Sequence, residues 1–182
     1  MKEKVLLIVF VSFLSWLQVT AQNNATLEAI NKQVWIPYEK AFEMLNAPLF
    51  KSVHAAEMVC IEADAKTIKE VGPYVEGYQQ WFNEVKQSKG ALQLTLRFFE
   101  RIYTEHTASE RGVYQMQMTD GKGEKSIFYG QFHMLLKKKK KQWKIVMDYD
   151  SSEGNTIGEE DYLAAKTLQD VDHFHQETPK ED

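Results

Sequence analysis

The chain has 182 residues, of which 43% are hydrophobic and 26% are charged, so it can bury one core and lacks the polar excess of disordered chains. Its formal net charge of −4 at pH 7 argues against general nucleic-acid binding, which depends on cations that neutralise phosphates. Its one cysteine, Cys60, has no partner for an internal disulfide, and its apolar neighbours predict a place in the core.

The first residues have the three-part build of a cleaved secretory signal. Lys2 and Lys4 precede an apolar run over residues 5–17, and Val19-Thr20-Ala21 supplies the small residues that a signal peptidase recognises. The run is shorter than the roughly 20 residues of a bilayer-spanning helix. We therefore expect residues 1–21 to be a signal peptide. The mature chain is then periplasmic or extracellular, with no membrane span after cleavage.

The first half of the mature chain has helical spacing. Apolar residues recur every three or four positions over residues 25–46, and Pro37 is expected to kink this helix or to begin a second one. A short helix is expected over residues 49–54. Brief extended pieces follow, and Gly72-Pro73 then opens another helix.

The second half changes to a period of two, which predicts long half-buried strands joined by hairpins. In the last of these strands, Trp143, Ile145, Met147 and Tyr149 share one apolar face. The lysine run Lys137–Lys141 lies where two strands meet and is expected at a solvated hairpin tip. Helices first and strands afterwards predict an α+β fold in which helices cover one face of the sheet.

Three stretches resemble the nuclear-transport-factor-2-like superfamily, and more closely its secreted bacterial SnoaL-like branch. They are VWIPYEKAF, LRFFERIYTEHTASERGVY and GQFHMLLKKKKKQWKIVMDYDSS, and the likeness extends from Thr26 to Ser152. The resemblance implies a cone-shaped domain over residues 22–152, in which a strongly curved antiparallel sheet wraps around about three helices. It also implies a pocket at the open end of the cone and a homodimer formed through the outer face of the sheet. Residues 153–182 would be a polar C-terminal extension, with a helix over Glu159–Phe174.

Members of that superfamily include isomerases, cyclases, dehydratases, hydrolases and binding proteins without catalysis, so the fold alone does not assign a function. Three hypotheses follow. The first is an exported, non-catalytic domain that binds a small apolar ligand, for which Tyr38, Trp81, Tyr114, Met147 and Tyr149 are the expected lining. The second is an isomerase- or cyclase-type enzyme with an interior carboxylate, and the third is a dimeric accessory protein without a ligand. A buried ionisable group inside a pocket would favour the enzyme.

Asp148 and Asp150 lie two positions apart on a strand and therefore point to one face. Paired carboxyl groups can act as acid and base when their surroundings differ. The apolar face that begins with Trp143 is the natural core face, however. The two aspartates are therefore expected on the outer face or at the rim, with Asp148 kept as a candidate base.

Glu100 has two interpretations. If its strand runs without a break, Glu100 shares a face with Leu96 and Phe98, and burial would raise its pKa as a catalytic base requires. If the adjacent Phe98 and Phe99 mark a β-bulge, the faces exchange and Glu100 turns to solvent. The inward set would then be Phe99, Arg101 and Tyr103.

His133 is a third candidate base, although a lone strand histidine is usually a surface or hydrogen-bonded residue. His173 and His175, with nearby aspartates, could bind a metal, but a flexible polar tail is the favoured interpretation. The sequence contains no glycine-rich phosphate loop and no spacing of a nucleophile, histidine and acid. Neither a metal nor a cofactor is expected.

Overall fold

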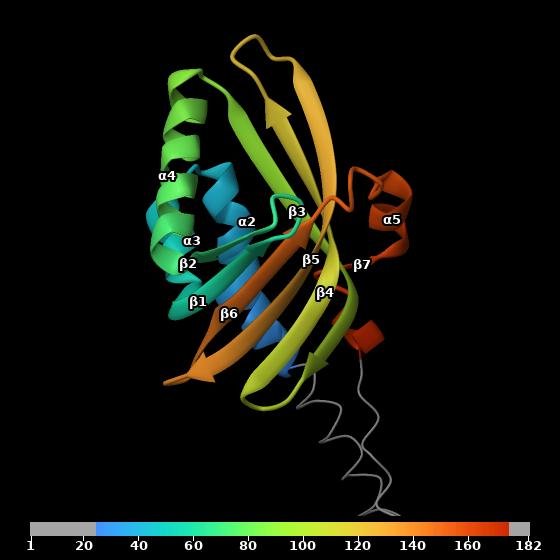
Figure 1. The fold of residues 1–182 in the computed structure, drawn as a ribbon. Coiled ribbons are helices and arrows are strands. Elements are labelled where there is room, and N and C mark those ends of the chain that lie inside the picture. The colour runs from blue at the N-terminus through green and yellow to red at the C-terminus, as the bar shows by residue number, and fades with distance from the viewer. Residues whose placement is uncertain (1–24, 175–182) are drawn as a thin grey trace, which may run out of the picture.

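The computed structural model describes residues 25–174, in which helices pack against one face of a seven-stranded sheet (Figure 1). The predicted α+β class is confirmed. The expected signal peptide, the start at Gln22 and His175 lie outside the described residues. Within residues 25–174, no helix is long and apolar enough to cross a membrane.

The predicted N-terminal helix changes its winding just before Pro37. Residues 25–30 are helical, Asn31–Trp35 form a π-helical turn (η1), and α2 (Ile36–Glu43) begins with Pro37 in its first turn. Proline cannot donate the hydrogen bond that an α-helix needs from that position. The wider turn before it therefore lies where the regular ladder of bonds would break.

Two further helices complete this layer. The helix α3 (Ala47–Ser52) is capped by Asn46, whose side-chain oxygen accepts a 2.9 Å hydrogen bond from the amide of Leu49. The long helix α4 (Val71–Gln87) follows and carries Tyr74, Val75, Phe82 and Val85 on its buried side. In Figure 1, α2, α3 and α4 lie on one side of the sheet and the short C-terminal helix α5 lies on the other.

The sheet is mixed, with the order β2-β1-β6-β5-β4-β3-β7. Its strands are β1 (His54–Glu62), β2 (Thr67–Glu70), β3 (Ala91–Tyr103), β4 (Thr107–Thr119), β5 (Lys125–Lys139), β6 (Gln142–Ser151) and β7 (Lys166–Thr167). All neighbours are antiparallel except β1 and β6, which run parallel. The expectation of a wholly antiparallel sheet is thus corrected at this pair, whose strands are far apart in the chain and are not held by a hairpin.

A β-bulge at Phe99 exchanges the two faces of β3. Phe98 pairs with Gly112 of β4 and Glu100 with Arg111, so Phe99 has no partner of its own. Phe99 is 48% exposed. Beyond the bulge, Arg101 and Tyr103 are buried and Glu100 faces outward. The bulged alternative therefore describes this strand, except that Phe99 itself does not turn inward.

A second bulge, at Val146, exchanges the two faces of β6. Ile145 pairs with Leu136 of β5 and Met147 with Leu135, so Val146 is the extra residue. Trp143 and Ile145 lie in the core as expected. After the bulge the inward side chains are Asp148 and Asp150. The predicted continuation of the apolar face through Met147 and Tyr149 is therefore wrong, and so is the outer-face placement of the two aspartates.

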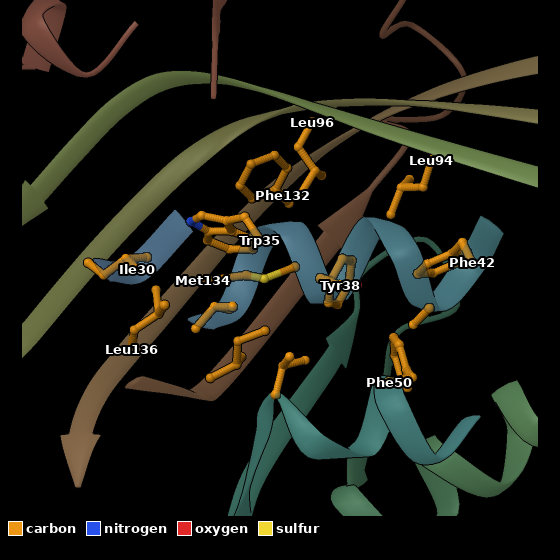
Figure 2. Close-up of a cluster of buried hydrophobic side chains, with 14 of the residues drawn as sticks. Ile30, Trp35, Tyr38, Phe42, Phe50, Leu94, Leu96, Phe132, Met134 and Leu136 are labelled. Atoms are coloured by element: carbon orange, nitrogen blue, oxygen red, sulfur yellow. The ribbon is translucent and has the colours of Figure 1, made fainter. Parts of the chain in front are cut away.

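The core fills the space between the helices and the sheet. Figure 2 shows Trp35, Tyr38 and Phe42 along one helix, with Leu94 and Leu96 of β3 facing them. The Trp35 ring lies 5.4 Å from the ring of Phe98. Cys60 is buried, as its neighbours predicted. Lys140 and Lys141 form the turn between β5 and β6, which confirms the hairpin tip.

A buried ion pair lies beyond the apolar core, where the bulge at Phe99 turns Arg101 toward Glu110. Arg101 Nη2 is 3.1 Å from Glu110 Oε2, and both side chains are fully buried. The indole of Trp35 donates a 2.6 Å hydrogen bond to the same carboxylate, and Arg101 donates to Asn31 at 2.7 Å. The Glu110 carboxylate thus has two donors, whereas Arg101 forms its hydrogen bonds through Nη2 and leaves Nε and Nη1 buried without a partner among the described residues.

The residues after Ser152 pack on this end of the molecule. The helix α5 (Glu159–Ala164) stops well before the predicted end at Phe174, because β7 then pairs with the edge of β3. Leu168 and Phe174, the latter in the 3₁₀ turn η2 (Val171–Phe174), are buried in the core, so this segment is not the loose tail that was expected. Among residues 25–174, no cluster of histidine, cysteine and acidic side chains could hold a metal ion.

Candidate functional site

A cavity of about 310 Å³ lies between the helical layer and the inner face of the sheet. Six elements line it, mostly with aromatic, leucine and methionine side chains. The lining consists of Tyr38, Phe42, Tyr78, Trp81, Leu94, Leu96, Tyr114, Met116, Met118, Phe128, Phe132, Met134, Asp148 and Asp150. In the part of the chain that the structure describes, two carboxyl groups are thus the only charged side chains in this largely apolar wall.

Local periodicity explains how the chain brings this lining together. Tyr38 and Phe42 are four residues apart on α2, and Tyr78 and Trp81 are three apart on α4, so each pair lies on one face of its helix. The strands contribute alternate residues, such as Tyr114, Met116 and Met118 of β4. The two carboxyl groups come from β6, where the bulge at Val146 has reversed the alternation. Bulges that re-aim side chains in this way are common beside binding sites.

Asp148 is the most deeply placed of these charges, with 2% of its surface exposed. Its pKa is raised from the usual range to about 7, chiefly because burial removes the carboxylate from water. The phenol of Tyr74 on α4 opposes this rise by donating a 2.8 Å hydrogen bond to Oδ2. The negative charges of Asp150 and Glu62 add to it. Near neutral pH, Asp148 is therefore present both as an acid and as a carboxylate.

Asp150 lies two residues further along the same face and is half-buried. Its pKa is raised to about 6, first by burial and then by the charges of Glu62 and Asp64, while Lys69 lowers it. Lys69 Nζ lies 2.7 Å from Glu62 Oε1, so the positive charge of this lysine is already paired. The two aspartates thus have different surroundings, one almost fully buried and one half-buried. Different surroundings are the condition under which one carboxyl group can donate a proton while the other accepts one.

The polar groups beside the aspartates are neutral. Burial raises the pKa of the Tyr38, Tyr74 and Tyr78 phenols well above the usual range, so they remain hydrogen-bond donors at neutral pH. Burial also lowers the pKa of His54 to about 4. His54 Nδ1 lies 2.8 Å from the carbonyl oxygen of Phe50, which can only accept, so this nitrogen carries the proton.

Four of the predicted site residues line the cavity, namely Tyr38, Trp81, Tyr114 and Asp148. Their roles stay predictions. Met147 and Tyr149 lie on the outer face and do not line it, because the bulge at Val146 was not foreseen.

Glu100 and His133 also lie outside the cavity. The Glu100 carboxylate is 3.9 Å from the guanidinium of Arg111 on the outer surface. His133 Nε2 forms a 2.9 Å hydrogen bond with the hydroxyl of Ser109, and burial lowers the pKa of this histidine. Of the two interpretations of Glu100, the one in which it turns to solvent therefore holds. Neither Glu100 nor His133 is placed to act on a ligand in the cavity.

Sequence reasoning missed Asp150 as a site residue, and it also missed the contributions of Tyr74 and Tyr78. A signal for the second bulge existed: Val146 and Met147 are adjacent apolar residues in an alternating strand, as Phe98 and Phe99 are. Two apolar residues side by side are consistent with a change of face. In β6 this signal is masked, because Trp143, Ile145, Met147 and Tyr149 at alternate positions also form an uninterrupted apolar face.

No protein-family model and no curated protein matches the chain. Solved structures do. A putative dehydratase from the NTF2-like family of Streptomyces avermitilis is 13% identical with a TM-score of 0.58, over 70% of this chain and 95% of the other. An NTF-2-like protein of unknown function from Shewanella oneidensis MR-1 is 18% identical, with a TM-score of 0.52 over 72% and 98%.

A third similar structure is a ketosteroid isomerase-like protein from Erwinia carotovora atroseptica, which is 16% identical. Its TM-score is 0.52, and the match covers 69% of this chain and 94% of the other. Identities this low carry information on the fold and not on the ligand or the reaction. The chain has the nuclear-transport-factor-2-like cone fold, built here as a mixed seven-stranded sheet with helices packed against it.

Proposed function

We propose that the protein binds a small, largely apolar molecule in this cavity, with a polar group of the ligand facing Asp148 and Asp150. The observation that carries the proposal is the composition of the wall, which is aromatic and aliphatic except for these two carboxyl groups. Small-molecule sites commonly combine an apolar surface with a few convergent polar groups that orient the ligand. A cavity of about 310 Å³ suits a molecule of one or two fused rings.

Calorimetric titration with 1-naphthalenemethanol tests this proposal, because the probe joins a neutral two-ring body to one hydroxyl group. Trp81 lines the cavity, and Trp81→Ala is expected to weaken binding by about fivefold or more through lost ring contact. Leu163 on α5 is 59% exposed and lies outside the cavity lining, so Leu163→Ala serves as the matched control. Absence of binding, or equal weakening by both changes, would contradict the proposal.

A second candidate is an acid–base enzyme of the isomerase type that acts on such a ligand. The observation that favours it is the pair of carboxyl groups in the cavity with pKa values of about 7 and 6, both raised chiefly by burial. One of them can remove a proton from a carbon beside a carbonyl group while the other, protonated, donates to the carbonyl oxygen. The neutral phenol of Tyr38, which also lines the cavity, is a further donor for that oxygen.

Hydrogen exchange at the α-carbons of 2-tetralone in deuterium oxide separates the enzyme from the binder. The enzyme hypothesis expects the protein to accelerate loss of the α-proton NMR signals over buffer alone, and Asp148→Asn combined with Asp150→Asn to abolish the acceleration. A binder without catalysis gives the buffer rate with both proteins. Saturable binding of the ketone is to be shown for both the wild type and the double variant. A lack of exchange can then not be explained by a lack of binding.

We further propose that the protein forms a homodimer through the outer face of the sheet. Ile102 of β3, Leu135 of β5 and Met147 of β6 lie in one row across that face, with Ser109 of β4 between Ile102 and Leu135. Ile102 and Leu135 are 52% and 38% exposed. Exposed apolar rows of this kind are typical of interaction surfaces. Sedimentation analysis of the wild type and of Ile102→Glu tests this: a dimer that becomes a monomer supports it, and a wild-type monomer contradicts it.

Export is likewise a proposal, supported by the signal-like residues 1–21. Mass spectrometry of protein recovered outside the cytoplasm of its native host is expected to give a chain that begins at or near Gln22. An exported chain that retains Met1 would contradict cleavage at this position.

A further inference from the structure

The charged side chains that line the cavity are both acidic. Among residues 25–174, Asp148, Asp150 and tyrosines are the ionisable residues of the lining, to which no Lys, Arg or His contributes. The charged groups that influence the two carboxyls are Glu62 and Asp64, which repel them, and Lys69, which is paired with Glu62.

The other ionisable groups near the two carboxyls are neutral. His54, which packs against Tyr38 and Tyr74, is neutral because burial lowers its pKa to about 4. The thiol of Cys60 and the phenols of Tyr74, Tyr78 and Tyr114 are neutral because burial raises their pKa.

The carboxyl groups also have unused hydrogen-bonding capacity. A carboxylate can accept about four hydrogen bonds. Within residues 25–174, Asp148 receives one, from Tyr74 to Oδ2, and the Asp150 side chain receives none. Neither forms an ion pair with a described residue. The contrast with Glu110 is clear, since that buried carboxylate has Arg101 and Trp35 as partners. A buried carboxyl group without a cation either keeps its proton, as the raised pKa values of Asp148 and Asp150 reflect, or ionises beside a cation that comes from outside.

The rest of the wall suits a positive charge as well. Phe42, Tyr78 and Trp81 form a continuous aromatic cluster, with ring centroids 5.5 Å apart for Phe42 and Tyr78 and 5.8 Å apart for Tyr78 and Trp81. The faces of aromatic rings attract cations, and they do so more strongly when the cation is shielded from water. Aromatic rings combined with carboxylates are the arrangement that recognises ammonium groups rather than anions.

We infer that the ligand is an amine, a compact apolar or aromatic molecule whose ammonium group is held by Asp148 and Asp150 and whose body contacts the aromatic wall. This inference rests on the proposed function, because it names the ligand class of the same cavity. The ammonium group of the ligand supplies the positive charge that the cavity lining lacks, and it donates hydrogen bonds to the carboxylate oxygens that have no protein donor. An anionic ligand would be repelled by the ionised carboxyl groups, and a neutral one would supply no positive charge to balance them when they ionise.

Three probes with one ring system and different charges test the inference: 1-naphthylmethylamine, 1-naphthalenemethanol and 1-naphthoate. At pH 8 both carboxyl groups are mostly ionised, since their pKa values, raised mainly by burial, are about 7 and 6. The expected order of affinity is amine, then alcohol, then carboxylate, with the amine binding about tenfold or more tighter than the alcohol.

The variants Asp148→Asn and Asp150→Asn connect the charge preference to these residues. Each keeps a side chain of similar size, and the asparagine oxygen at position 148 can still accept from Tyr74. Both changes are expected to weaken amine binding by about tenfold and to weaken alcohol binding by clearly less, because the neutral hydroxyl loses a hydrogen bond to a charged group but no ion pair. Glu76→Gln is the matched control, because it removes one negative charge from an exposed position on α4, outside the cavity lining. Circular dichroism and thermal melts establish that each variant is folded.

The outcomes separate this inference from the proposed function. If none of the three probes binds, the proposed function fails and the inference fails with it. If the alcohol binds as tightly as the amine, or if Glu76→Gln reduces amine binding as much as Asp148→Asn does, the ligand class is wrong and the apolar binding site stands. Selective loss of amine binding in the two asparagine variants supports both.

Discussion

The phenol of Tyr74 on α4 donates a 2.8 Å hydrogen bond to the carboxyl group of Asp148 on β6, and so joins the helical layer to the bulged strand. Both side chains are almost fully buried. Burial raises the pKa of both groups, so the phenol stays protonated over the range in which Asp148 ionises. The ionisation of Asp148 is therefore set by burial and moderated by one helix residue.

Removing this hydrogen bond should make Asp148 a weaker acid. In Tyr74→Phe the Asp148 carboxylate loses the hydrogen bond that it accepts from α4, while the aromatic ring remains in place. A hydrogen bond to a charged group contributes roughly 1.5–3 kcal/mol, so the pKa of Asp148 should rise by about one unit or more. Carboxyl-carbon NMR titration measures it. Tyr129→Phe is the control, because the Tyr129 hydroxyl bonds to Gln115 and not to Asp148, and equal titrations in all three proteins would contradict the role given to Tyr74.

The raised pKa of Asp148 should make the protein less stable as the pH rises. Burial raises the folded-state pKa to about 7, whereas the unfolded chain titrates near its usual range. The folded state therefore retains the proton longer, and stability present below about pH 4 is lost as the pH rises through about 7. The difference is on the order of 4 kcal/mol.

Urea denaturation of the wild type and of Asp148→Asn between pH 4 and pH 8 measures this loss. The variant should gain stability relative to the wild type as the pH rises, because it has no carboxyl group to ionise at this position. If the difference in the free energy of unfolding between the two proteins is constant from pH 4 to pH 8, Asp148 does not have a raised pKa from burial in solution. Glu76→Gln controls for the removal of a negative charge.

The buried pair of Arg101 and Glu110 should show strong coupling. Arg101→Met leaves a buried carboxylate without its cation, and Glu110→Leu leaves a buried guanidinium without its anion, so each is expected to cost about 3–5 kcal/mol. The double variant should cost much less than the two single costs added together. Denaturant melts of the four proteins give the coupling energy, and simple additivity would contradict the ion pair.

Trp143 opens β6 on the inner face, before the bulge, and is 1% exposed. Trp143→Ala should lower the free energy of unfolding by about 3–5 kcal/mol, because it removes a large side chain from a packed core. Phe99→Ala provides the comparison, since this ring is 48% exposed at the other bulge. A loss under about 1 kcal/mol for Trp143→Ala in denaturant melts would show that its face is assigned wrongly.

The sequence by itself determined the elements and most of their faces. Helical spacing in the first half and strict alternation in the second indicated an α+β fold, because side chains repeat every 3.6 residues on a helix and every two on a strand. The same alternation placed Tyr114 and Met116 of β4, and Phe132 and Met134 of β5, on one side of the sheet, where the structure has them in the cavity wall. These patterns are local, so one chain segment is enough to reveal them.

Only the tertiary structure decided which carboxyl groups enter the cavity. A bulge arises when a strand pairs with its neighbour in a register that leaves one residue unmatched, so it depends on two segments at once and not on the periodicity of either. In β3 the bulge at Phe99 turned Glu100 out and Arg101 in, and in β6 the bulge at Val146 turned Asp148 and Asp150 in. One unmatched residue exchanges the faces of everything that follows it. For that reason the two carboxyl groups of this cavity can be located only from the pairing of β5 with β6.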